Sequence, residues 1–257
     1  MLLLDRSGLW VILYFYPGGY EVRPYMHDRR FLMRTSLKGL TGNQLKLLAL
    51  LFMTVDHVGM MLFPQHIGFR IIGRLAMPIF AFMIAEGCRH TRSKVKYLLR
   101  MAGVAAVCQL VYFFAMGSLQ QSILVTFSLS IGLILLCDLA REKNAWGWLT
   151  LGLAAAWFLC RVLPDLIAGF SVDYGIFGVL LPVLVYLGKD RKGRLLHLIL
   201  GLVVLCLDLG SIQWYCLGAA ALLALYNGQR GKARMKHLFY IYYPAHLVII
   251  YLISYLL

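Results

Sequence analysis

Residues 45–63 read LKLLALLFMTVDHVGMMLF. An apolar run of about this length can cross the hydrocarbon core of a bilayer as a helix. The run nevertheless contains two adjacent ionisable residues, Asp56 and His57. Because charged side chains are costly inside a membrane, residues of this kind usually mark a functional site. The stretch therefore predicts a spanning helix that carries chemistry.

The composition of the whole chain is typical of a membrane protein. Of its 257 residues, 61% are hydrophobic and 14% are charged, and the mean hydropathy is +0.76. Soluble domains are usually about 45–50% apolar. The formal net charge of +14 would also suit a nucleic-acid-binding protein, but the basic residues form short clusters between apolar runs. Orientation in a membrane explains such clusters more economically, so we expect no nucleic acid as a partner.

Apolar runs recur along the chain and predict an all-α fold, a polytopic transmembrane helix bundle. We expect about nine spans, with eight to ten allowed by the lengths of the runs. Their approximate limits are 43–63, 70–88, 97–116, 122–140, 146–163, 172–187, 195–209, 211–227 and 237–257. The pair 195–209 and 211–227 also suits a hairpin that enters the membrane and returns.

The basic residues alternate between the connections. The segment before the first span and every second connection after it contain at least two Lys or Arg, whereas the others contain at most one. The positive-inside rule therefore predicts a cytoplasmic N-terminus and an outward C-terminus. At 1.5 Å per residue, His57 then lies roughly 9 Å from the outer end of its helix.

The first 32 residues differ from the remainder. Trp10–Tyr16 is apolar but too short to span, and Pro17-Gly18-Gly19 follows it. We expect 1–32 to be an irregular N-terminal extension, upstream of a start at Met33, and 33–257 to be a single membrane domain. The six cysteines have neither CxxC nor zinc-type spacing, so we expect no metal site and no disulfide framework.

Several polar residues in or near the spans are candidates for a site. Arg70 and Arg74 share one face of the second span; Arg74 is the expected partner of Asp56, and Arg70 either snorkels to the outer surface or joins the site. Asp173, at the outer start of the sixth span, is either an N-cap or a carboxylate partner of His57. A further set follows one face of the last span by steps of three residues: Tyr240, Tyr243 and His246.

The loop RHTRSKVKYLLR, residues 89–100, contains five Lys or Arg. Orientation alone explains about two of them. The loop therefore either contacts anionic lipid headgroups or forms a phosphate-binding patch on the cytoplasmic side.

Five motifs together resemble the TraX family. In chain order they are LKLLALLFMTVDHVG, FRIIGRLAMPIFAFMIAEGCRHTRSKVKYLLR, VDYGIFGVLLP, YNGQRG and HLFYIYYPAHLVII. The resemblance covers about residues 43–253 and leaves 1–32 uncovered. The family contains the conjugative F-pilin acetylation protein, which acetylates the N-terminal alanine of the pilin. It therefore implies a multi-pass protein of the bacterial inner (cytoplasmic) membrane.

TraX proteins are in turn similar to the wider transmembrane acyltransferases, in which an intramembrane histidine of an early helix is the catalytic base. That similarity implies His57 as the base and acetyl-CoA as the co-substrate. Those enzymes also bind acyl-CoA phosphates at a cytoplasmic RxxR-type patch, whose bare spacing is present here in Arg89–Arg92 without the usual flanks. The donor-binding residues implied are Arg89, His90, Arg92, Lys94 and Arg100.

The expected function is acetyl transfer from cytoplasmic acetyl-CoA to an acceptor at the outer side. The acceptor is an amine, at the N-terminus of pilin or another peptide, or a hydroxyl of a glycan or lipid headgroup. A histidine suits this role because its pKa lies near the working pH. By depth, Asp56 or Asp173 is expected to orient the imidazole, and Arg74 or Tyr243 to stabilise the oxyanion. The acyl path or substrate site is expected to involve Arg70, Tyr240, Tyr243 and His246.

Two other functions fit parts of the sequence less well. A proton- or ion-coupled transporter would use Asp56, Arg74, Glu86 and His246 as a relay, but the DH pair of the first span has no counterpart in a later repeat, as transporters usually require. An intramembrane protease or hydrolase would need a nucleophile or zinc motif, and neither HExxH nor GxSxG occurs in the sequence.

Overall fold

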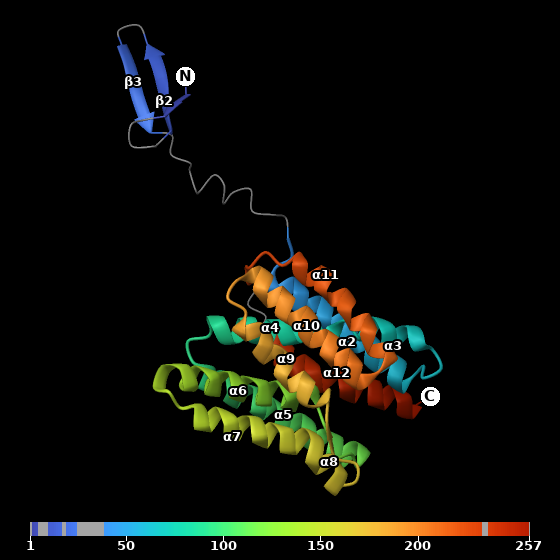
Figure 1. Cartoon of the computed structure of the whole chain (residues 1–257). Coiled ribbons are helices and arrows are strands. Elements are labelled where there is room, and N and C mark those ends of the chain that lie inside the picture. Colours follow the sequence, from blue (N-terminus) through green and yellow to red (C-terminus); the bar gives the residue numbers. More distant parts are fainter. Residues whose placement is uncertain (1, 5–9, 17–18, 25–38, 233–235, 257) are drawn as a thin grey trace. The chain divides into compact units, whose positions relative to one another are not determined.

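The computed structural model describes the whole chain except residues 1, 5–9, 17–18, 25–38, 233–235 and 257 (Figure 1). The chain divides into two compact units, residues 1–39 and residues 40–257.

The first unit contains a three-stranded antiparallel sheet of order β1-β2-β3. Its strands are Leu2–Leu4 (β1), Trp10–Tyr16 (β2) and Gly19–Pro24 (β3). The prediction of irregular structure is therefore wrong for the residues of these strands. β2 is a run of mostly aromatic and β-branched side chains, which favour strands, and it pairs with β3 from Val11 and Pro24 to Tyr16 and Gly19.

The second unit is a helical bundle, which confirms the all-α class of the membrane domain. Its α-helices are Gly42–Met61 (α2), Ile67–Gly73 (α3), Ala76–His90 (α4), Lys94–Met116 (α5), Ile123–Lys143 (α6), Trp146–Trp157 (α7), Leu163–Leu166 (α8), Gly175–Leu187 (α9), Arg191–Leu209 (α10), Ala219–Ala224 (α11) and Lys236–Leu256 (α12). A π-helical turn (η1, Phe158–Val162) joins α7 to α8, and a 3₁₀ helix (η2, Ser211–Gly218) leads into α11. Two short strands, β4 (Gln120–Gln121) and β5 (Ser171–Val172), pair in parallel.

Five helical stretches of the described residues are long and apolar enough to cross a membrane: 42–61, 67–90, 94–114, 123–143 and 146–166. The apolar stretches 175–187, 211–224 and 241–256 are shorter. The membrane character is thus confirmed. The count of nine spans and the orientation of the termini stay predictions.

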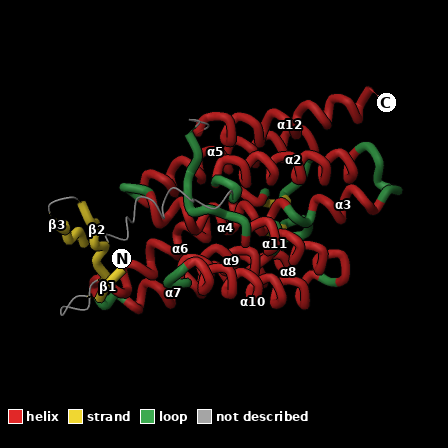
Figure 2. Tube along the Cα trace, turned by 90° about the horizontal axis from the view of Figure 1, so that it is seen from above, coloured by secondary structure: helices red, strands yellow, loops and turns green. Residues whose placement is uncertain are grey.

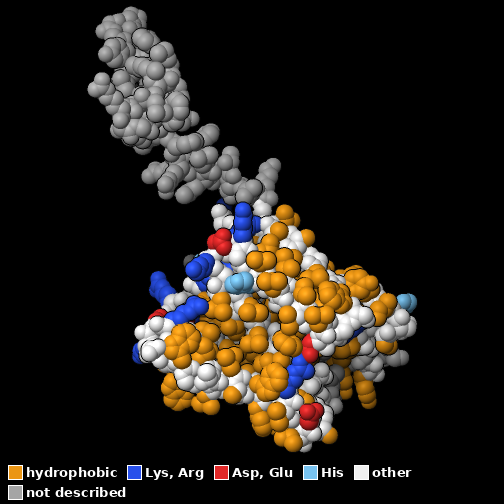
Figure 3. Space-filling view, viewed as in Figure 1, with side chains coloured by type: hydrophobic (Ala, Val, Ile, Leu, Met, Phe, Trp, Pro, Cys, Tyr) orange, Lys and Arg blue, Asp and Glu red, His pale blue; other side chains and the backbone are white. Residues whose placement is uncertain are grey.

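The helices of the bundle run side by side with roughly parallel axes (Figure 2). α4, α6 and α9 pack against one another and form the centre of the bundle, while α5 and α7 pack on α6 from outside. Large apolar side chains such as Leu110, Phe114 and Leu151 are exposed on α5 and α7. Apolar side chains also cover most of the face in Figure 3, where Lys and Arg gather mainly toward one side. An apolar exterior of this kind suits a lipid environment.

Side-chain contacts bring the basic connections together at one end of the bundle. Arg89 donates to the carbonyls of Tyr186 and Gly188, and Lys94 pairs with Asp138. Arg194 pairs with Glu86 at 3.1 Å, and Arg191 donates to the carbonyl of Ala224.

Candidate functional site

His57 and His246 meet where α2 packs against α12. Nε2 of His246 lies 3.2 Å from Nδ1 of His57, which also lies 2.9 Å from the carbonyl oxygen of Met53. Nδ1 of His246 lies 3.0 Å from the carbonyl oxygen of Tyr242. The Tyr242 hydroxyl is 2.7 Å from Oγ1 of Thr54 on α2, so a second polar contact holds the two helices together.

These distances fit one set of tautomers. Because Nδ1 of His246 faces a carbonyl, which accepts, Nδ1 carries the proton and Nε2 is left to accept. Nδ1 of His57 then donates to that Nε2 and to the Met53 carbonyl. His57 is therefore left with a lone pair on Nε2, which is the state that a general base requires.

Asp56 occupies a neighbouring ion cluster rather than the histidine pair. Its carboxylate is 2.6 Å from Arg70 and 3.0 Å from Arg74. Arg74 also lies 3.4 Å from Oε1 of the buried Gln213. The i,i+4 spacing of the two arginines explains why both reach one carboxylate, although they flank the break between α3 and α4. Pro78 in the first turn of α4 favours that break, because proline cannot continue the hydrogen bonding of a longer helix.

The turn before α9 completes this cluster. Tyr174 is the N-cap residue of α9, so neither Ser171 nor Asp173 caps that helix. Tyr174 has a φ of 60°, an unfavourable value for a residue with a side chain that often marks functional sites. The guanidinium of Arg74 lies 5.9 Å from the centre of the Tyr174 ring, and the Asp173 carboxylate interacts electrostatically with Arg74 and Asp56.

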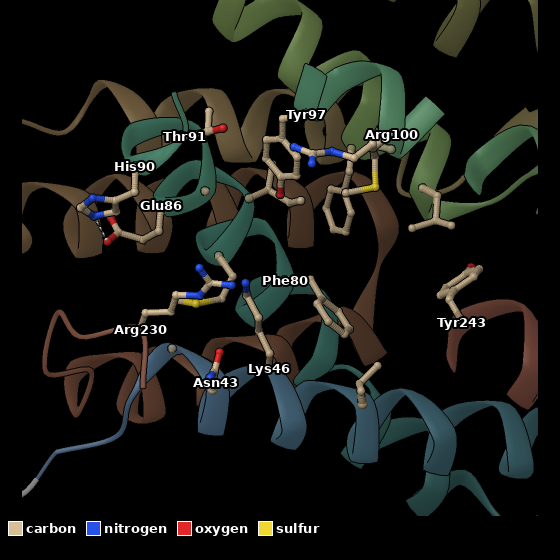
Figure 4. Close-up of a pocket in the computed structure, with 18 of the residues that line it drawn as sticks. Asn43, Lys46, Phe80, Glu86, His90, Thr91, Tyr97, Arg100, Arg230 and Tyr243 are labelled. Atoms are coloured by element: carbon tan, nitrogen blue, oxygen red, sulfur yellow. Dashed lines mark ion pairs between the residues drawn. The ribbon is translucent and has the colours of Figure 1, made fainter. Parts of the chain in front are cut away.

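A cavity of roughly 690 Å³ lies between α2, α4, α5, α6 and the segment after α11. Its basic end is lined by Lys46, His90, Arg92, Arg100 and Arg230. Tyr243 lies at the opposite end (Figure 4). That volume is within the range of small-molecule sites, about 300–1,000 Å³.

The cavity ends one helical turn before the histidine pair. Met53, whose carbonyl contacts His57, lines it. Tyr243 also lines it, with its ring 5.5 Å from that of His246, and the hydroxyl groups of Tyr243 and Tyr112 share a hydrogen bond. The cavity thus connects a positively charged end with the immediate neighbours of a candidate base.

The comparisons with known proteins identify the family. A family model described as TraX protein matches residues 41–254. The chain belongs to the TraX family. It is also 25% identical over 237 residues to a probable fimbrial assembly protein FimC (serogroup H1) of Dichelobacter nodosus, covering 80% of this chain and 93% of that protein. An uncharacterized protein of Rickettsia prowazekii (strain Madrid E) is 55% identical over 38 residues, 15% of each chain. No solved structure matches significantly.

The structure distributes the residues that the sequence singled out in this TraX chain over three places. His57 and His246 form the pair, with Tyr243 beside them, and Asp56, Arg70 and Arg74 form the ion cluster, with Asp173 near it. His90, Arg92 and Arg100 line the cavity. Arg89 and Lys94 instead contact α9 and Asp138 of α6. Tyr240 belongs to α12, but its side chain lies outside the described residues.

Sequence reasoning missed two cations of the TraX cavity, Lys46 and Arg230. In the sequence, both lie among the basic residues that predict the orientation, at the start of the first span and after the eighth. The signal available was the motif YNGQRG, whose glycines and asparagine predict a turn. The sequence alone gives no means of placing that turn beside α2.

Proposed function

We propose that this TraX-family chain is an integral membrane acetyltransferase. It moves an acetyl group from cytoplasmic acetyl-CoA to an amine at the outer side, with His57 as the general base. The observation that carries the proposal is the cavity that runs from a cationic end to the neighbours of the His57–His246 pair. Phosphates suit the cationic end, and the apolar wall in between, with Leu50, Phe80 and Met83, suits an uncharged arm.

The reaction needs one proton acceptor. The acceptor amine attacks the thioester carbonyl, and Nε2 of His57 takes the proton that the amine loses. The tetrahedral intermediate then expels the thiolate of CoA, which recovers that proton from His57. The products are the N-acetylated acceptor and CoA thiol. Arg74 or Tyr243 supplies positive charge or a hydroxyl to the oxyanion, as such donors do in acyl transfer.

The proposed topology has nine spans with the basic end of the bundle in the cytoplasm. The contacts that gather the segments of Arg89, Lys94, Arg191 and Arg194 at one end support this orientation, since such charges are retained on the cytoplasmic side. Acetyl-CoA, a cytoplasmic metabolite, would enter from that end.

Pilin-like peptides are the acceptor class that we favour over glycans and lipid headgroups. The family model and the printed name of the Dichelobacter nodosus relative, a fimbrial assembly protein, support this preference. The acceptor would present its N-terminal amine at the outer side.

Transfer of labelled acetyl from acetyl-CoA to a synthetic pilin N-terminal peptide, in proteoliposomes, tests the proposal. We expect His57→Gln to lower the rate by roughly 100-fold to 10,000-fold, the usual contribution of a general base. His66→Gln is the matched control, because His66 is an exposed histidine between α2 and α3. A folded His57→Gln protein that transfers acetyl at the wild-type rate would overturn the assignment of the base.

A further inference from the structure

Two cations enter the cavity from segments far apart in the sequence. Lys46 projects from the second turn of α2, and Arg230 projects from the segment that follows α11. The two side chains point toward one another across the cavity (Figure 4), and their like charges interact. Bringing two positive charges together inside a protein is unfavourable unless an anion joins them.

The backbone fixes this juxtaposition. The first turn of α2 has N–H groups without partners in the helix. The N–H of Gly42 donates to the carbonyl of Gln229 at 2.8 Å, and that of Asn43 donates to the carbonyl of Arg230 at 2.9 Å. The segment carrying Arg230 therefore acts as a cap on the helix that carries Lys46 and His57.

The charges on the cavity wall do not balance. Among the described residues that line the cavity, Glu86 is the single acidic one, against four Lys and Arg. Glu86 is buried and already pairs with Arg194 at 3.1 Å, outside the lining. The wall therefore favours a ligand that brings several negative charges.

We propose that Lys46 and Arg230 form a phosphate-binding site for the phosphates nearest the acyl-bearing arm of the donor. Arg92 and Arg100 remain for the rest of its nucleotide. Lysine supplies a point charge and arginine a planar fork that matches phosphate oxygens. This inference rests on the proposed function for the identity of the donor, but the site itself rests on the geometry of the cavity.

The spacing between this site and the base agrees with such a donor. α2 is one continuous helix from Gly42 to Met61, so Lys46 and His57 are separated by roughly 16 Å along its axis. An extended chain advances about 1.1–1.2 Å per bond, so the pantetheine arm, with about twelve bonds from phosphate oxygen to sulfur, spans roughly 14 Å. A phosphate held at the level of Lys46 thus brings the thioester sulfur to within about 2 Å of the level of His57 along the helix axis.

Donor truncation tests the site through its kinetic signature. In the double variant Lys46→Gln/Arg230→Gln we expect KM for acetyl-CoA to rise at least tenfold while kcat changes less than twofold. KM for S-acetylpantetheine, which has no phosphate, is expected to stay unchanged. Lys232→Gln, two residues beyond Arg230 and exposed, is the matched control. An unchanged KM for acetyl-CoA in the double variant would overturn the site.

Direct binding separates this inference from the proposed function. Calorimetry with CoA alone requires no acetyl transfer, so loss of CoA affinity in the double variant supports the site even if no acetylation occurs. Conversely, transfer activity with wild-type CoA affinity in the double variant rejects the site and leaves the function standing. The charge-conserving variant Lys46→Arg/Arg230→Lys should retain binding, which controls for misfolding.

An anionic lipid headgroup offers the same phosphate chemistry from another source. CoA affinity measured in nanodiscs of phosphatidylglycerol and in nanodiscs of phosphatidylcholine would distinguish the two sources. CoA affinity that depends on Lys46 and Arg230 in both lipids supports the donor. If the double variant instead retains less phosphatidylglycerol while its CoA affinity is unchanged, the site binds lipid and the proposal is overturned.

Discussion

At the scale of single residues, the hydrogen bond from His57 to His246 sets which nitrogen of His57 is left to act as the proposed base. We predict that His246→Ala lowers kcat by roughly fivefold to tenfold, the value of about one hydrogen bond, with KM for acetyl-CoA unchanged. His246→Gln should retain most of the activity, because its amide oxygen can accept the same proton near the position of Nε2. Steady-state kinetics of the two variants provide the measurement. Equal losses of kcat in both would show that a hydrogen-bond acceptor at position 246 is irrelevant.

A second prediction at this scale concerns the ion cluster of Asp56 with Arg70 and Arg74. The side chains of Asp56 and Arg74 are 15% and 11% exposed, so removing the carboxylate leaves two arginines with poor access to water. We expect Asp56→Asn to destabilise the protein by about 3 kcal/mol, measured as a fall in Tm in detergent. Asp165→Asn, at an exposed aspartate of α8, should change Tm little. A Cβ at Gly73 would lie 2.1 Å from Asp56 Oδ1, so Gly73→Ala should reproduce the loss if the cluster is the cause.

At the scale of elements, the cap that the Arg230 segment forms on α2 depends on Gly231. Its φ is 93°, and an added Cβ would lie 3.1 Å from Oγ1 of Thr41. We predict that Gly231→Ala lowers the free energy of unfolding by about 1–2 kcal/mol. We also expect it to weaken CoA binding by displacing Arg230. Thermal unfolding and calorimetry measure the two effects. Gly103→Ala in α5, where a Cβ meets nothing within 4 Å, is the control and should leave both unchanged.

Local chemistry made several elements predictable. Apolar runs located the helices, and the place of Arg74 in the second span pointed to Asp56 as its partner. The sequence analysis does not predict the strands of the first unit, because the length of Trp10–Tyr16 excludes a span but says nothing of the strand preference of its β-branched and aromatic side chains.

Contacts between distant segments were not predictable in the same way. The pairing of residues 40–43 with residues 225–230 arises from backbone hydrogen bonds, which leave no pattern in either stretch. Lys94 likewise looks like one more loop cation until α5 is packed against α6, where Asp138 stands opposite it. The sequence therefore indicates well which side chains are costly to bury. It indicates less well which of these side chains contact one another.

At the scale of the whole molecule, α2 connects the two halves of the proposed chemistry. Its first turns carry Asn43 and Lys46 at the cationic end, and its last turns carry Asp56 and His57. A donor that lies along this helix would therefore have its phosphate near one end of a rigid element and its thioester carbon near the other. Rigid elements hold such separations more accurately than loops do.

The orientation of the bundle is the last prediction, and the native cysteines make it easy to measure. All six are buried, so a membrane-impermeant maleimide should give little background. We expect Gln65→Cys, in the exposed connection between α2 and α3, to be labelled on intact spheroplasts. Lys192→Cys, exposed at the start of α10, should be labelled after permeabilisation alone, because the positive-inside rule predicts a cytoplasmic location for its basic connection. The reverse pattern would place the cationic end of the cavity outside, away from cytoplasmic acetyl-CoA, and the proposed direction of transfer would fail with it.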